Sequence, residues 1–168
     1  NSKRSMSLHD LSLNVLIIED EMHAVEKLER YLQKYSAFIK VISKIESVTH
    51  SVEWLKQHQS EIDLIFMDIQ LTDGLSFKIF DQVKVEKPVI FITAFNEYAL
   101  DAFKVNGIDY LLKPITYSDL SVSLQKLENL KSQLKWGETE TEKLKEVLSA
   151  MPTKNYKNRF MVKLGDHI

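Results

Sequence analysis

The chain has 168 residues, 44% of them hydrophobic, no cysteine and a formal net charge of −2. This length suits one domain with a small extension, and the near-neutral charge gives no global basic field that would favour nucleic acid. The absence of cysteine excludes a disulfide framework, no apolar stretch is long enough to span a bilayer, and the polar start lacks the apolar core of a signal peptide. We therefore expect a soluble, cytoplasmic protein.

Short apolar runs alternate along the chain with segments of helical periodicity, which is the pattern of a parallel sheet covered by helices. Five strands are predicted near residues 14–18, 38–42, 63–67, 88–92 and 109–112. Five helices are predicted after residue 21, around residues 48–55, after residue 74, over about residues 96–105 and after residue 116. The sequence therefore indicates an α/β domain.

Apolar residues at helical spacing mark the inner faces of these helices. The first helix carries Val25, Leu28, Leu32 and Tyr35, and the second carries Val48, Val52 and Leu55. The third carries Leu75, Ile79 and Phe80, the fourth Tyr98, Ala102 and Phe103, and the fifth Leu120, Leu124, Leu127 and Leu134. Thr116 and Asp119 are spaced as a capping box at the start of the fifth helix.

The two ends of the chain differ from this pattern. Residues 1–12 are expected to be a disordered or artificially added tail. Residues 135–157 are expected to be a linker with a short amphipathic helix, because a capping-box pattern at 139–142 precedes apolar residues at helical spacing. Residues 158–168 alternate like the start of one strand, which cannot bury itself and is either a remnant of a second domain or packs on the first.

Polar side chains follow the apolar runs at the points where the strands should end. Glu19 and Asp20 follow the first run, Asp68 the third, Thr93 the fourth and Lys113 the fifth. Ligands bind beyond the carboxyl ends of the strands in open parallel sheets, so these side chains should meet there. Any one acid could simply end a strand in solvent. Their joint placement instead favours a site for a divalent cation, which prefers oxygen ligands, and a phosphoryl group.

Within this site Asp68 is the candidate nucleophile, because carboxylates can form aspartyl-phosphates. Lys113 would neutralise the incoming phosphoryl charge, and the Thr93 hydroxyl would donate a hydrogen bond to a phosphoryl oxygen. Catalysis of such a transfer consists mostly of positioning and charge stabilisation.

Four motifs together resemble the receiver domain of two-component response regulators over residues 13–134. They are LIIEDE at 16–21, DLIFMD at 63–68, VIFITA at 89–94 and DYLLKP at 109–114. Residues 94–115 are similar to the subgroup of LytTR-type (LytR/AlgR-like) transcriptional regulators, and residues 158–168 look like the truncated start of their DNA-binding domain. The resemblance implies a flavodoxin-like fold: a doubly wound, five-stranded parallel sheet of order 2-1-3-4-5 with helices on both faces.

The resemblance also implies roles for single residues. Asp68 would accept a phosphoryl group from the histidine of a sensor histidine kinase. Glu19, Asp20, Asp68 and the backbone carbonyl of Gln70 would hold Mg²⁺ or Mn²⁺, and Thr93 would contact the phosphoryl group. The same contact is implied for the lysine of DYLLKP, whose peptide bond to the following proline would be cis.

Further implications concern the output. Tyr110 would be the aromatic switch, turning inward on phosphorylation, and the fourth helix, fifth strand and fifth helix would form the face of a homodimer. DNA would be bound only through the missing C-terminal domain, and no membrane is involved. The chain would not be an enzyme beyond Mg²⁺-assisted self-phosphorylation and autodephosphorylation.

Two departures from the family pattern stand out. Glu19 occupies a position where many members have Asp, and the loop IQLTDG after Asp68 is shorter than usual, with Thr72 in place of the usual proline. Two other functions stay open. The chain could be an aspartate-nucleophile phosphatase, although Gln70 stands where such enzymes carry a general acid. It could also be a receiver-like module that binds partners without phosphate.

Overall fold

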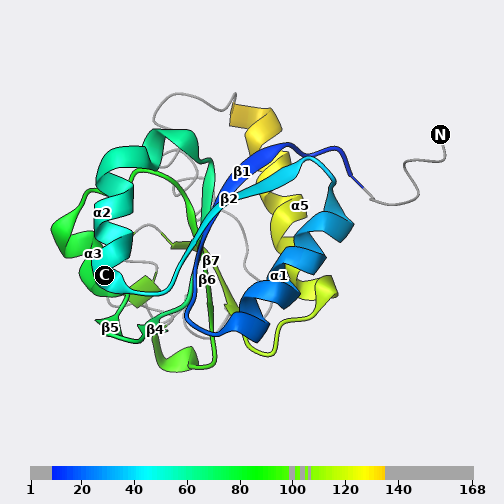
Figure 1. Cartoon of the computed structure of the whole chain (residues 1–168). Helices are drawn as coiled ribbons and strands as arrows, with labels where there is room; N and C mark the ends of the chain where they lie inside the picture. The colour runs from blue at the N-terminus through cyan, green and yellow to red at the C-terminus, as the bar shows by residue number, and fades with distance from the viewer. Residues whose placement is uncertain (1–8, 99–100, 103–104, 106, 135–168) are drawn as a thin grey trace, which may run out of the picture.

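A computed structural model describes residues 9–98, 101–102, 105 and 107–134, which form a five-stranded parallel sheet between helices (Figure 1). The strands are β1 (Leu13–Ile18), β2 (Ile39–Ile45), β3 (Leu64–Met67), β6 (Val89–Thr93) and β7 (Gly107–Leu112). They lie in the order β2-β1-β3-β6-β7, and all neighbouring pairs are parallel. Counted within this sheet the order is 2-1-3-4-5, so the predicted doubly wound fold is confirmed.

Helices cover both faces of the sheet (Figure 1). Helices α1 (Met22–Tyr35) and α5 (Tyr117–Leu134) lie on one face, and α2 (Val48–His58) and α3 (Phe77–Gln82) lie on the other. Each face has its own apolar cluster, because the sheet separates them. Every residue of β3 and β6 is buried, which explains why both were recognised as continuous apolar runs. No helix among the described residues is long and apolar enough to cross a bilayer.

The predicted inner faces of the first two helices are confirmed. Val25, Leu28, Leu32 and Tyr35 of α1 are all buried, and so are Val48, Val52 and Leu55 of α2. The predicted start of the fifth helix is also confirmed, since the Asp119 amide donates to the Thr116 hydroxyl at 3.1 Å. These local signals agree with the tertiary packing, so each helix presents its apolar side to the sheet.

Strand β2 is an edge strand and differs from its prediction. It begins at Ile39, after the 54%-exposed Phe38, and runs three residues beyond the predicted end to Ile45. Its side chains alternate between exposed positions and positions that are buried at the strand ends and half-buried between them, because an edge strand is only partly covered. The apolar run in the sequence was therefore shorter than the strand.

The segment after β3 folds as a small antiparallel hairpin, which the sequence did not predict. Strand β4 (Gln70–Leu71) pairs with β5 (Gly74–Leu75), and Gly74 has the positive φ of 137° that favours glycine. The prediction that Leu75 lies on the third helix is wrong, because α3 begins only at Phe77. Ile79 is buried as predicted.

The domain begins earlier than predicted. The expectation of a tail over residues 1–12 is wrong for residues 9–12. Leu11 is buried, and its carbonyl accepts a 2.6 Å hydrogen bond from the Ser36 hydroxyl. The His9 ring stacks on Tyr35 with centroids 4.0 Å apart, and the Tyr35 hydroxyl donates to Glu128 at 2.7 Å.

Some predictions fall partly or wholly outside the described residues. The fourth predicted helix begins as a 3₁₀ turn, η3 (Asn96–Tyr98), and Ala102 is buried as predicted. A second 3₁₀ turn, η2 (Gln59–Glu61), follows α2. Residues 99–100, 103–104, 106 and 135–168 lie outside the description, as does the side chain of Leu134. These ranges contain Phe103, the predicted linker helix and the predicted strand-like tail.

Candidate functional site

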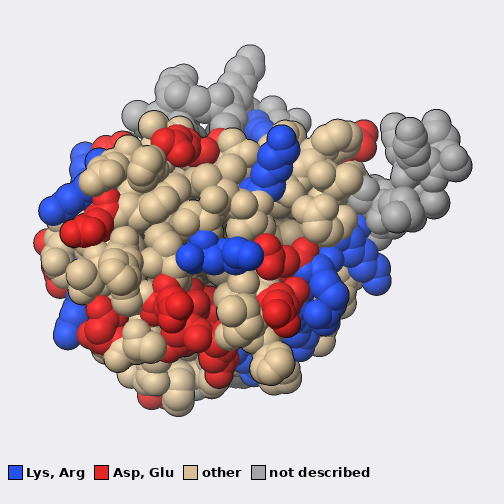
Figure 2. Space-filling view, in the orientation of Figure 1, with Lys and Arg blue, Asp and Glu red and all other residues tan. Residues whose placement is uncertain are grey.

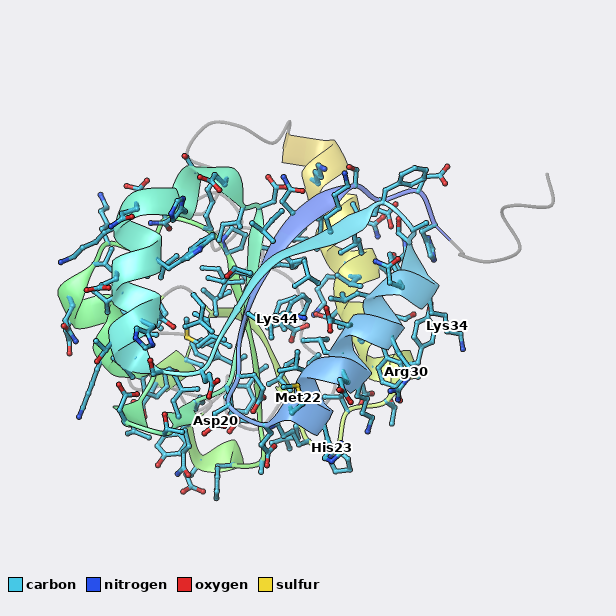
Figure 3. All side chains as sticks on the ribbon, viewed as in Figure 1. Asp20, Met22, His23, Arg30, Lys34 and Lys44 are labelled. Carbon is cyan, nitrogen blue, oxygen red and sulfur yellow. The ribbon has the colours of Figure 1, made fainter. Side chains whose placement is uncertain are left out.

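Three carboxylates meet at the carboxyl ends of β1 and β3. Glu19 and Asp20 follow Ile18, and Asp68 follows Met67, which pairs with Ile18 in the sheet. One carboxylate oxygen from each of the three acids lies within 4.8 Å of the others. Acidic side chains gather in the lower part of Figure 2, where Figure 3 labels Asp20. The structure thus brings the predicted acids together in one pocket.

Lys113 joins these carboxylates from the end of β7. Its Nζ lies 3.0 Å from Asp68 Oδ2, 3.1 Å from Glu19 Oε1 and 2.8 Å from Glu21 Oε1. The backbone amide of Lys113 donates to the Thr93 carbonyl at 2.8 Å, which ties the end of β7 to the end of β6. The Lys113–Pro114 peptide is cis, as the resemblance implied. One ammonium group therefore contacts three carboxylates.

The pocket holds more negative than positive charge, and the pKa values reflect this. Burial, followed by repulsion from Asp68, raises the pKa of Glu19 to about 7. Burial also raises the pKa of Asp20. The pKa of Lys113 is raised, because hydrogen bonds to Glu21 and Asp68 outweigh the opposing effect of burial. The hydrogen bond from Lys113 lowers the pKa of Glu21. A divalent cation would relieve the repulsion among these acids.

The Asp68 carboxylate is buried and held in one orientation. Its Oδ1 accepts hydrogen bonds from the amides of Ile69, at 2.6 Å, and Gln70, at 3.4 Å, and its Oδ2 faces Lys113. The Asp68 amide itself donates to the Ile18 carbonyl at 2.9 Å. The side chain is 9% exposed, so only a limited part of it is accessible to a reactant.

Thr93, the last residue of β6, carries an unsatisfied hydroxyl. The residue is fully buried, and its Oγ1 has no hydrogen-bond partner among the described residues. A buried hydroxyl without a partner is unfavourable and calls for an explanation. A phosphoryl oxygen on Asp68 would be one candidate acceptor for it.

Tyr110 lies away from the carboxylates, on the face covered by α2 and α3. Its side chain is buried, and its hydroxyl donates to the backbone carbonyl of Phe95, two residues after Thr93. Burial raises the pKa of the Tyr110 phenol. The predicted switch residue is therefore already turned inward in this structure, and it contacts the segment that follows Thr93.

A pocket of about 430 Å³ opens beside Lys113, between α1 and the loop that precedes α5. Its walls include Ala24 and Leu28 of α1 together with Pro114 and Ile115, and Glu19 lies at its border. Arg30 and Lys34 lie farther along α1, away from Asp20 (Figure 3).

Sequence reasoning missed two residues at the site. Glu21 contacts Lys113 and stands in the same acidic run as Glu19 and Asp20, so the run itself was the available signal. Asp73 lies in the hairpin after Asp68 and accepts hydrogen bonds from the first residues of α2. That contact joins residues 25 positions apart in the chain, and no local sequence pattern predicts it.

Comparison with known proteins identifies the family. The profile of the response regulator receiver domain matches residues 15–125. The chain belongs to this family. The response regulatory domain of protein mrkE from Klebsiella pneumoniae is 30% identical, with a TM-score of 0.61 over 71% of this chain and 98% of that chain.

Curated relatives of this receiver domain are longer proteins. The sensory transduction protein LytT of Bacillus cereus is 36% identical over 122 residues, which are 71% of this chain and 48% of LytT. The transcriptional regulatory protein BtsR of Escherichia coli K12 is 32% identical over 123 residues, or 72% of this chain and 50% of BtsR. The chain thus spans about half the length of the curated relatives it matches.

Proposed function

We propose that this receiver domain acts in a phosphorelay and that Asp68 accepts the phosphoryl group from a phosphohistidine of a sensor histidine kinase. The observation that carries the proposal is the environment of Asp68: a buried carboxylate held by two backbone amides, beside two further acids and Lys113. This arrangement supports Asp68 as a nucleophile, with Lys113 beside it to balance the negative charge during phosphoryl transfer.

In the proposed step, a carboxylate oxygen of Asp68 attacks phosphorus. The N–P bond of the donor breaks, and its electron pair remains on the imidazole nitrogen; because the other ring nitrogen carries a proton, the imidazole leaves as a neutral molecule. The aspartyl-phosphate formed carries the charge that Lys113 would neutralise, and the unpartnered Thr93 hydroxyl would donate to one of its oxygens. Chemistry of this kind depends on positioning and charge stabilisation.

Glu19, Asp20 and Asp68, together with the backbone carbonyl of Gln70, would hold Mg²⁺ or Mn²⁺. The donor set fits, because these hard cations take oxygen ligands and the three carboxylates already converge. The cation, when bound, supplies electrostatic stabilisation of the phosphoryl oxygens. Beyond the transfer from phosphohistidine, self-phosphorylation from a small donor and autodephosphorylation are the only reactions proposed for this chain.

We further propose how phosphorylation of Asp68 would be passed on, through Tyr110 and through the surface next to it. Phosphorylation would draw Thr93 toward Asp68 and move the Phe95 carbonyl that Tyr110 contacts. Leu112 of β7 and Val122 of α5 are exposed apolar side chains on the face proposed for the homodimer. In the full-length protein, acting in the cytoplasm, this dimer would control DNA binding through a LytTR-type domain beginning at residues 158–168, after a linker over residues 135–157.

Intact-mass measurement after treatment with acetyl phosphate tests the assignment of Asp68. We expect one added phosphoryl group with Mg²⁺, none with EDTA, and none in Asp68→Asn. The matched control is Asp81→Asn on the exposed side of α3, which should label like the wild type. Light scattering on the same samples measures whether labelling promotes a dimer. Labelling of Asp68→Asn equal to that of the wild type would refute the assignment.

The same samples separate the two other functions. Turnover of a generic phosphomonoester well above background would favour the aspartate-nucleophile phosphatase. The absence of any adduct, with a stable fold, would favour a receiver-like module that binds partners without phosphate.

A further inference from the structure

The backbone that orients Asp68 belongs to the short hairpin β4–β5. The amides of Ile69 and Gln70 donate to Asp68 Oδ1, and Gln70 is the first residue of β4. At the other end of the hairpin the Ser76 amide donates to the Ile69 carbonyl at 2.7 Å. The position of the hairpin therefore determines where the groups that hold the proposed nucleophile lie.

This hairpin has little stability of its own. Each of its strands has only two residues, and isolated two-stranded hairpins are at best marginally stable in water. Its turn depends on Gly74, whose φ of 137° is rarely adopted by other residues. A contact with the rest of the fold is therefore needed to hold the loop in place.

Asp73 provides that contact at the tip of the hairpin. Its Oδ1 accepts a 2.7 Å hydrogen bond from the Val48 amide, and its Oδ2 accepts 3.1 Å bonds from both the amide and the hydroxyl of Thr49. Val48 and Thr49 are the first two residues of α2, whose N-terminal amides favour a carboxylate. These bonds lower the pKa of Asp73, so the clamp is charged at neutral pH.

Helix α2 does not need Asp73 as its cap. The Ser47 hydroxyl already accepts the His50 amide at 3.1 Å and caps the helix from its own N-cap position. Asp73 reaches the helix from a different segment, on the loop that leaves Asp68. Its three bonds therefore connect two parts of the fold, whereas the Ser47 bond is local to α2.

We infer that Asp73 is a positioning residue for the phosphoacceptor. By clamping the hairpin to α2, it holds the Ile69 and Gln70 amides against Asp68 and fixes the Gln70 carbonyl that would face the cation. This inference rests on the proposed function of Asp68. The inference also explains how the short loop after Asp68 keeps its position although it has Thr72 in place of the usual proline. The ionised side chain of Asp73 holds it.

Amide hydrogen exchange, measured by NMR on the metal-free protein, tests the clamp without any chemistry at the site. In Asp73→Ala we expect exchange at Ile69 and Gln70 to accelerate about tenfold, because the loss of hydrogen bonds to a charged group shifts a local opening equilibrium by at least that factor. The matched control is Ser47→Ala, which removes the local cap of α2 and should leave both amides unchanged. Equal acceleration in the two variants would mean that only helix stability matters, and would overturn the inference.

The Mg²⁺ concentration that gives half-maximal labelling by acetyl phosphate provides the second measurement. It should rise about tenfold in Asp73→Ala and stay unchanged in Ser47→Ala. If Asp73→Ala does not fold, Thr49→Val, which removes one of the three bonds, should shift both measurements in the same direction by a smaller factor. Unchanged exchange in every folded Asp73 or Thr49 variant would refute the clamp.

The two measurements separate the inference from the function on which it rests. A wild-type protein that never labels would refute the proposed function, while the exchange measurement would still decide whether Asp73 holds the loop. A wild-type protein that labels, beside an Asp73→Ala variant with the same exchange and the same Mg²⁺ dependence, would refute the inference alone.

Discussion

The unfolding free energy of the metal-free protein should fall as the pH rises from 5 to 8, and replacing Glu19 by Gln should abolish most of this fall. The pKa of Glu19 rises from 4.5 to about 7 on folding, mainly because the side chain is buried. Between these values the folded protein keeps a proton that the unfolded chain has released. Stability from Glu19 is therefore fully present below pH 4.5 and is lost as the pH rises through 7.

The size of this effect follows from the shift. A rise from 4.5 to about 7 corresponds to about 3 kcal/mol of unfolding free energy lost between pH 4.5 and pH 8. Little discount for solvent is needed, because Glu19 is only 8% exposed. A glutamine resembles the protonated acid, so Glu19→Gln should be more stable than the wild type at pH 8 by up to about 3 kcal/mol.

Urea unfolding in EDTA at several pH values between 5 and 8 measures this difference. Glu53→Gln, on the exposed side of α2, is the matched control and should keep the wild-type pH dependence. Adding Mg²⁺ should stabilise the wild type more at pH 8 than at pH 6, because protons compete for Glu19. Parallel curves for Glu19→Gln and the wild type over this range would refute the reasoning.

Three further variants probe other contacts. Thr93→Val removes a buried hydroxyl that has no partner among the described residues, so the melting temperature should stay equal or rise while labelling by acetyl phosphate slows about tenfold. Tyr35→Phe breaks the 2.7 Å bond to Glu128 and should cost about 1–2 kcal/mol in urea unfolding, with unchanged labelling. Gly107→Ala would place its Cβ 2.4 Å from the Ala102 carbonyl oxygen, so a loss of about 1–3 kcal/mol is expected; a wild-type unfolding midpoint would contradict this packing.

The central part of the fold and of the site could be predicted because local and tertiary signals agree there. Strands β3 and β6 are buried on both faces, so their apolar runs coincide with the strands. The residues that follow parallel strands must meet at one edge of the sheet. Asp68 and Lys113 could therefore be placed together, and the structure joins them at 3.0 Å.

The features that the sequence did not predict depend on long-range contacts. Strand β2 continues through Ser43 and Lys44 because β1 pairs with them, although neither residue is apolar. Leu11 is buried by the residues that surround it in the fold, and nothing in its polar neighbours indicates this. In the sequence Asp73 looks like an ordinary turn residue, and only the fold, in which α2 lies beside it, shows its hydrogen bonds to that helix.

The contacts of Lys113 imply an order of events. Without a cation the pocket contains four carboxyl groups, Glu19, Asp20, Glu21 and Asp68, and the ammonium of Lys113 is shared among three of them. A doubly charged donor would meet net repulsion there and would find the lysine already engaged. If the proposed function holds, the site should therefore take up its cation first and its anion second, so that the supply of free divalent cation, as well as the kinase, would set how readily Asp68 is phosphorylated.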